Sequence, residues 1–144
     1  MKKRLFLLAL SLLMLVGTTV SAIDTKDVVP RASYYLDAYS VAFAAEGDET
    51  MCVSVLVEGV GTQDKIGISY IDIEEKVGNR WSYVDTIEAA DNSYFYEYDS
   101  DVYMDDVYFE GTPGVEYRVI VCVYAGKNGG SDTRTITSES CVCR

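Results

Sequence analysis

The sequence contains no histidine among its 144 residues. This excludes histidine as a general acid or base, catalytic triads that depend on it, and metal sites that it ligates. Basic residues are also few: 12 Lys and Arg stand against 23 Asp and Glu, and the net charge is −11. A strongly anionic chain is a poor binder of nucleic acid and of anionic membranes, so we expect neither as a partner.

Long apolar runs are absent after the N-terminus. Residues 2–4 are basic, residues 5–16 are apolar, and Val20-Ser21-Ala22 is a small-residue cleavage site. This order is typical of a secretory signal peptide, which we place at residues 1–22. The alternative is a retained membrane anchor, although a spanning helix needs roughly 20 apolar residues. We expect a secreted, extracellular protein without membrane insertion after cleavage.

Helical periodicity is nearly absent from the rest of the chain, whereas apolar and polar residues alternate with a period of two. We predict an N-terminal extension at residues 23–38 and an all-β domain at 39–144. Seven or eight short strands in about 100 residues are typical of an immunoglobulin-like, fibronectin type III-like antiparallel β-sandwich. Tyr117 follows a Pro-Gly turn at the start of a strand, where a tyrosine corner would bond back to upstream backbone.

The expected strands are separated by glycine, asparagine and aspartate. They cover residues 39–45, 51–58, 71–74, 81–84, two strands within 91–110 that bend near 99–101, then 117–124 and 132–137. Residues 59–67 read as a glycine-punctuated connection. Trp81 is predicted to pack in the core, because a lone tryptophan in a short strand packs more often than it binds a ligand.

Four cysteines remain after signal cleavage: Cys52, Cys122, Cys141 and Cys143. An exported chain meets an oxidising environment, so we predict two disulfides. The favoured pairing joins Cys52 and Cys122 to one tail cysteine each, and the runner-up joins Cys52 directly to Cys122. A thiolate metal site and free or intermolecular cysteines are the remaining alternatives.

Residues 91–110 are rich in acids and tyrosines and contain no basic residue. Carboxylates at a strand bend could bind Ca²⁺, which prefers six to eight oxygen ligands. The candidate metal ligands are Asp99, Asp101, Asp105 and Asp106. The alternative is that these acids are solvated and discourage edge-to-edge aggregation. The tyrosines could form a contact surface for a glycan or a protein, or pack in the core. The candidate contact residues are Tyr94, Tyr96, Tyr98 and Tyr103.

Several spaced motifs resemble a family of small secreted bacterial proteins that carry a domain of unknown function. The motifs are residues 61–67, Glu75-Lys76 with Trp81, 111–114 with Tyr117, and 130–134. This resemblance implies a signal peptide followed by one β-rich domain, and it implies no catalytic residue, ligand or partner. The Pro-Gly-x-x-Tyr strand entry separately resembles fibronectin type III modules, which bears on the fold alone.

The sequence therefore predicts a secreted, non-enzymatic β-sandwich that binds an unidentified protein or glycan. An alternative is a structural or inhibitory module whose negative charge acts on a basic partner. A less favoured alternative is a hydrolase that uses paired carboxylates. We predict no catalytic residue and no cofactor apart from the Ca²⁺ considered above.

Overall fold

One long strand, β2 (Thr50–Val77), organises the fold. The computed structural model describes residues 33–144, so the predicted signal peptide at 1–22 and residues 23–32 of the predicted extension lie outside the described residues. The described part of the chain forms a seven-stranded sheet whose paired strands are antiparallel. This confirms the predicted all-β, antiparallel class. Within residues 33–144, no helix is long and apolar enough to cross a membrane.

The other elements are short compared with β2. They are β1 (Leu36–Gly47), β3 (Arg80–Glu88), the 3-10 turn η1 (Ser93–Phe95), β4 (Tyr96–Glu110), β5 (Glu116–Lys127), β6 (Gly130–Thr137) and β7 (Cys141–Val142). β1 begins inside the predicted extension. The two strands predicted within residues 91–110 are one strand, β4, which bends where Asp99 adopts a φ of 52°.

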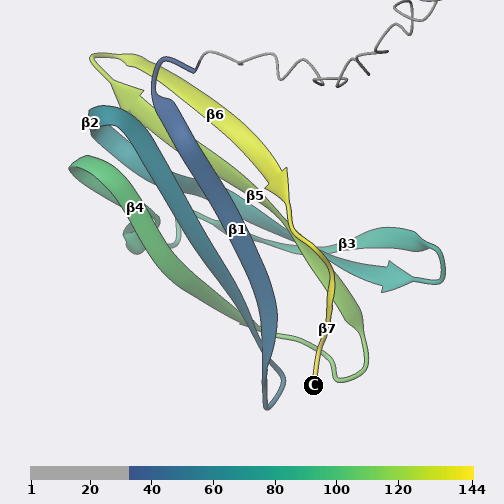
Figure 1. Ribbon diagram of the computed structural model, residues 1–144. Coiled ribbons are helices and arrows are strands. Elements are labelled where there is room, and N and C mark those ends of the chain that lie inside the picture. The colour runs from purple at the N-terminus through teal and green to yellow at the C-terminus, as the bar shows by residue number, and fades with distance from the viewer. Residues whose placement is uncertain (1–32) are drawn as a thin grey trace, which may run out of the picture. The chain divides into compact units, whose positions relative to one another are not determined.

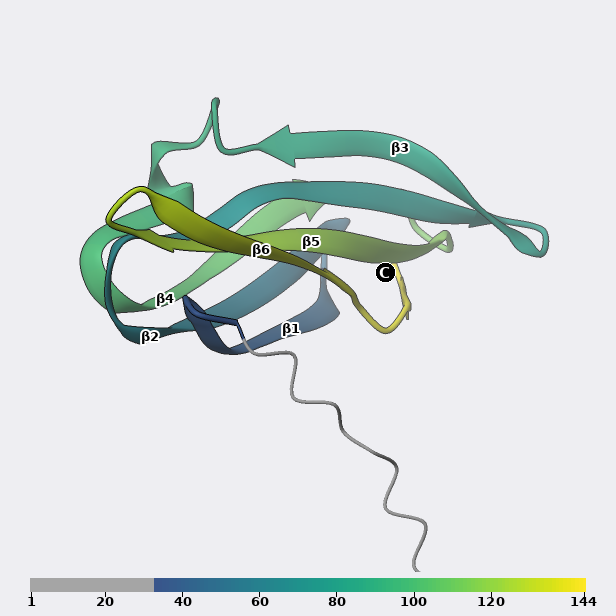
Figure 2. The same ribbon diagram turned by 90° about the horizontal axis from the view of Figure 1, so that it is seen from above.

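β2 belongs to both halves of a curled sheet. Its first half, residues 50–58, pairs with β1 along one edge and with β4 along the other. Its second half pairs with β5 along one edge and with β3 along the other. β6 pairs with β5 and extends the sheet beyond it. The sheet thus curls like a half-barrel, with β1 below and β3 above in Figure 2. Among the described strands, β3 pairs with β2 alone and projects from the sheet in Figure 1.

The segment predicted as a connection, residues 59–67, is part of β2. The strand bends there, because the pairing with β4 is interrupted between Glu58 and Gln63 and Gly61 has a φ of 67°. Glycine adopts this left-handed conformation without steric cost. The glycines therefore turn one strand from the first half of the sheet into the second, and they do not end it.

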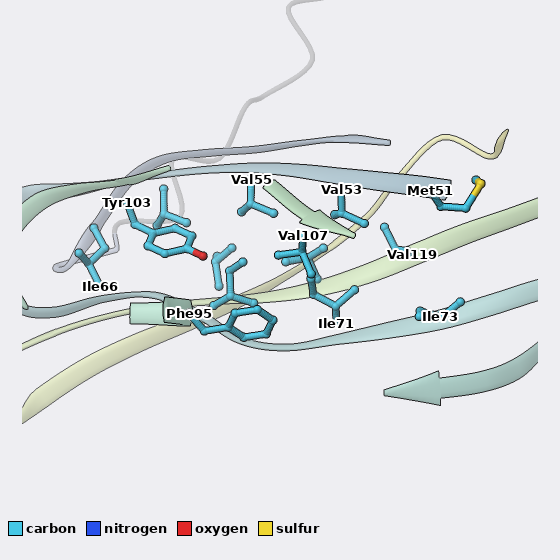
Figure 3. Close-up of a cluster of buried hydrophobic side chains, with 14 of the residues drawn as sticks. Met51, Val53, Val55, Ile66, Ile71, Ile73, Phe95, Tyr103, Val107 and Val119 are labelled. Atoms are coloured by element: carbon cyan, nitrogen blue, oxygen red, sulfur yellow. The ribbon is translucent and has the colours of Figure 1, made fainter. Parts of the chain in front are cut away.

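Side chains from the two halves of β2 meet in the core (Figure 3). The first half contributes the alternating face that the sequence predicts, namely Met51, Val53, Val55 and Val57. The second half and β5 contribute Ile66, Ile68, Ile71, Ile73, Val119, Val121 and Val123. Because successive strand residues point to opposite faces, this pattern leaves the intervening side chains on the outer face of the sheet.

Tyr117 forms the predicted tyrosine corner. Its ring is buried, and its hydroxyl oxygen accepts a hydrogen bond of 3.1 Å from the backbone N–H of Thr112. The bond holds the turn at residues 111–114 against the start of β5. Gly111 lies against the same ring, since a Cβ built on it would be 3.1 Å from Tyr117 Cε2.

The variant Tyr117→Phe is expected to lower the free energy of unfolding by about 1–2 kcal/mol, because the Thr112 N–H loses its partner in a partly buried site. Urea denaturation measures the loss. The matched control is Tyr83→Phe on β3, where the tyrosine is exposed and the change should be within about 0.5 kcal/mol. Equal losses in the two variants would contradict a stabilising role for the corner.

Trp81 lies outside the core, so the prediction that it packs there is wrong. It is half-buried on β3 and pairs with Lys76 of β2. The guanidinium carbon of Arg118 lies 4.5 Å from its ring centroid, and Lys76 Nζ lies 5.7 Å from it. Both cations also bind carboxylates, Arg118 with Glu74 at 2.6 Å and Lys76 with Glu116 at 2.8 Å. The hydrogen bond from Lys76 lowers the pKa of the Glu116 carboxyl.

Candidate functional site

The four tyrosines predicted as a contact surface do not share one environment. Tyr94 and Tyr98 are exposed, and Tyr96 is half-buried. Tyr103 is only 1% exposed, so its assignment to a contact surface is wrong. It pairs with Val57 and therefore belongs to the core face of β4. Burial raises the pKa of its hydroxyl, which has no hydrogen-bond partner within the described residues.

The four candidate metal ligands do not gather into a cage. Asp105 and Asp106 are consecutive in β4, so their side chains leave opposite faces of the sheet. Asp105 Oδ1 accepts a hydrogen bond of 2.9 Å from the Asp106 N–H. Asp101 lines a hollow with Asp37 and Glu58. In residues 33–144 no group of three or more Cys, Asp or Glu side chains could hold a metal ion, so the predicted calcium site is not formed there.

The four cysteines are free, and neither the favoured nor the runner-up disulfide pairing is present. Strand alternation gives the reason why the favoured pairing is absent. Cys143 packs in the core and Cys141 packs against it, whereas Cys52 and Cys122 lie on the outward sets of β2 and β5 and are not part of the core cluster. Burial raises the pKa of the Cys52 thiol, which makes it a poor nucleophile at neutral pH.

A cleft lies on the outer side of the sheet, where β4 begins beside β2. Its cavity volume is about 510 Å³, within the roughly 300–1,000 Å³ typical of small-molecule sites. We call it the tyrosine cleft. It is lined by Lys65, Ser69, Glu88, Ala89, Ala90, Ser93, Tyr96 and Tyr98. The lining thus combines aromatic rings, hydroxyl groups, one carboxylate and one ammonium group.

Two segments that are distant in sequence build the tyrosine cleft, residues 65–69 and residues 88–98. Lys65 of β2 pairs with Tyr98 of β4, and Gly67 pairs with Tyr96. The turn after β3 closes the other side, where the Ala89 N–H donates to the Ser69 carbonyl at 3.1 Å. Backbone pairing on both sides therefore fixes the lining before any ligand binds.

Side-chain contacts hold the aromatic wall in place. The Tyr96 hydroxyl donates a hydrogen bond of 3.1 Å to Ser69 Oγ. The Tyr96 ring meets the Tyr124 ring edge-to-face, with centroids 5.8 Å apart. Lys65 Nζ lies 3.7 Å from the centroid of Tyr96 and 5.4 Å from that of Tyr124. Tyr98 is 63% exposed and leaves its ring available at the rim.

The tyrosines of the cleft stand out in the sequence, but the other lining residues do not. Lys65 fell in the segment interpreted as a connection, and Ser69 and Glu88 carry no motif. Their place depends on the pairing of β2 with β3 and β4, which near the cleft joins Tyr70 to Glu88 and Lys65 to Tyr98. The available signal was the continued alternation through residues 65–73, which indicates that Lys65 lies in a strand.

The carboxylates of the lining bear on the chemistry that the cleft could perform. Among its described residues it has one carboxylate, Glu88, whereas glycoside hydrolysis generally uses two on either side of the scissile bond. A second hollow of about 420 Å³ lies on the outer face of the first half of the sheet, with Leu56 and Met104 among its lining residues. Its lining lacks an aromatic ring and a cation, so the tyrosine cleft is the stronger candidate.

No family model and no curated protein matches the chain. The resemblance to the secreted bacterial family therefore stays a prediction. Among solved structures, the chain is similar to Spo0M, a sporulation control protein from Bacillus subtilis. The TM-score is 0.41, the sequence identity is 14%, and the match covers 75% of this chain and 50% of that chain.

Proposed function

We propose that the protein is a secreted, non-enzymatic recognition module that binds a glycan in the tyrosine cleft. The observation that carries the proposal is the lining of that cleft, in which Tyr96 and Tyr98 lie beside Ser69, Ser93 and Glu88. A tyrosine offers a flat apolar ring with a polar tip. Sugars need both properties, because the C–H face of a pyranose packs on a ring while its hydroxyl groups need hydrogen-bond partners.

The size and rigidity of the cleft support the same ligand class. A cavity of about 510 Å³ has room for one or two sugar units. The walls are fixed by backbone pairing on β2 and by the bond from Tyr96 to Ser69. Because a preformed site loses little conformational freedom on binding, more of the contact energy appears as affinity.

The immunoglobulin-like or fibronectin type III-like form of the sheet belongs to this proposal. Its support is the tyrosine corner at Tyr117 and the presence of seven antiparallel strands in the described residues. Export rests on the signal-like sequence at residues 1–22. Export would place the protein outside the cell, where the proposed function needs it to bind a glycan.

The variant Tyr98→Ala is expected to weaken glycan binding by at least about tenfold, since it removes the exposed aromatic ring that the cleft offers at its rim. A glycan array identifies the tightest ligand, and titration calorimetry with that ligand gives the affinity. Tyr83→Ala is the matched control, because Tyr83 is 62% exposed on β3 and does not line the cleft. Equal affinities in the two variants, or no glycan bound by the wild-type protein, would contradict the proposal.

The electrostatic alternative predicts a different result. A module acting through its net charge of −11 would bind a basic protein, and salt would weaken that binding because charges are screened beyond about 8 Å at physiological ionic strength. Neither Tyr98 nor Tyr83 would then matter. Repeating the calorimetry at two salt concentrations therefore separates the two functions.

A further inference from the structure

Among residues 33–144, Lys65 is a cation that forms no ion pair with a carboxylate, in a chain where acids outnumber bases. The ion pairs within residues 33–144 are Lys76 with Glu116 and Arg118 with Glu74. Lys65 joins neither pair and makes no side-chain hydrogen bond to a described residue. Its ammonium group lies instead against two tyrosine rings at the wall of the tyrosine cleft.

The position of the ammonium group is built into the sheet. Lys65 lies where β2 is flanked by β4 at Tyr98 and by β5 at Gly126. Gly126 leaves room for the Tyr124 ring, since a Cβ built there would be 3.0 Å from Tyr124 Cζ. The rings of Tyr96 and Tyr124 then hold the Lys65 ammonium group by cation–π attraction. An ammonium group has three N–H donors, and the ring faces provide no lone-pair acceptor of the ordinary kind.

Glu88 lines the same cleft without neutralising Lys65. It is the carboxylate of the lining, and no ion pair joins it to Lys65. The cleft therefore presents a donor cation at one place and an acceptor carboxylate at another. A sugar with one anionic substituent and several free hydroxyl groups satisfies both, because its anion accepts from Lys65 and its hydroxyl groups donate to Glu88.

We propose that the tyrosine cleft selects a sugar that carries a single negative charge, a carboxylate or a sulfate ester, and that Lys65 binds this group. The inference rests on the proposed glycan-binding function and specifies its ligand class. The negative charge of the whole protein opposes such a ligand at long range, but salt screens that repulsion beyond about 8 Å. Within the cleft, the Lys65 ammonium would donate directly to the bound anion, and this short-range attraction is what the proposal depends on.

The test uses an array of matched oligosaccharides with the wild-type protein. Hexuronate oligosaccharides are paired with their carboxyl-reduced forms, and sulfated oligosaccharides with their desulfated forms. The wild-type protein is expected to prefer the anionic member of at least one pair by about tenfold or more, as for a hydrogen bond to a charged group. The pair in which the preference appears distinguishes a carboxylate from a sulfate.

Three variants then assign the preference. Lys65→Met keeps an unbranched apolar stem and removes the charge, so its affinities for the two members should differ by less than about twofold, while binding of the neutral member is retained. Lys65→Arg should keep most of the preference. Lys127→Met is the control, because Lys127 is exposed at the end of β5 and does not line the cleft. Thermal melts verify that each variant is folded.

Two outcomes overturn the inference in distinguishable ways. If the wild-type protein binds neutral and anionic members equally, or if Lys65→Met keeps the full preference, the role of Lys65 is wrong and the glycan-binding function stands. If neither member of any pair binds, the proposed function itself is wrong.

Discussion

Replacing Gly67 with alanine is expected to lower the free energy of unfolding by about 3–5 kcal/mol, the sum of a strained backbone and an overpacked contact. Gly67 has a φ of 149°, and a Cβ built on it would collide with the carbonyl oxygen of Phe95 and lie 3.0 Å from Tyr96 Cα. The atoms in the way are backbone, so no side-chain rotation relieves the contact.

The position of Gly67 explains why its loss should be severe. It lies where β2 pairs with Tyr96 of β4 on one edge and with Tyr124 of β5 on the other. Moving the Phe95 carbonyl would shift η1 and the beginning of β4 together. The same shift would open the tyrosine cleft, so we expect binding to be lost along with stability.

Gly61→Ala is the matched control for Gly67→Ala. Gly61 also has a positive φ, 67°, but a Cβ built on it meets nothing within 4 Å. Its cost should be limited to the left-handed conformation, about 1–2 kcal/mol. Urea denaturation of both variants gives the comparison. Similar losses of unfolding free energy in both variants would show that the close contact with Phe95 adds nothing to the cost of Gly67→Ala.

The variant Phe95→Ala is expected to cost about 3–5 kcal/mol, as is usual for a fully buried phenylalanine. Phe95 ends η1 and is 0% exposed, and its ring reaches the core from outside the strands that form it (Figure 3). η1 has no side-chain hydrogen bond at its N-cap, so this ring is its main attachment to the core.

Phe95→Leu is the comparison variant, because it keeps an apolar side chain that attaches η1 to the core. Leucine fills most of the same space, and the expected cost is below about 1.5 kcal/mol. Urea denaturation and the glycan affinity are measured together for both variants. We expect Phe95→Ala to lose affinity because η1 carries Ser93 at the wall of the tyrosine cleft. Unchanged affinity and stability in Phe95→Ala would contradict the role of η1 in holding the cleft.

Local alternation in the sequence predicted much of the fold. It placed Met51, Val53, Val55 and Val57 on one face, and it placed Tyr117 at a corner, because both depend on neighbours within a few residues. It failed at residues 59–67, where glycines indicated a connection. A bend within a strand and a break between strands have the same local composition, and only the pairing partners of β2 distinguish them.

The candidate site was less accessible from the sequence than the fold. Tyr96 and Tyr98 stood out by composition, but Tyr103 lies on the core face of the same strand, because its odd spacing from Tyr98 places it on the opposite face of β4. Trp81 was assigned to the core because a lone tryptophan in a short strand usually packs there, and the cations that contact its ring come from β2 and β5, which the local sequence does not reveal. Lys65, Ser69 and Glu88 meet only through long-range pairing, which a single sequence does not specify.

The most direct test of the account is a titration of the isotope-labelled protein with the best-bound anionic oligosaccharide, followed by amide NMR. The largest shift changes are expected at the tyrosine cleft, with Lys65, Ser69, Tyr96 and Tyr98 at its centre, and Lys65→Met should reduce them. Changes centred on Leu56 and Met104 in the second hollow, or no saturable change at any residue, would contradict the account.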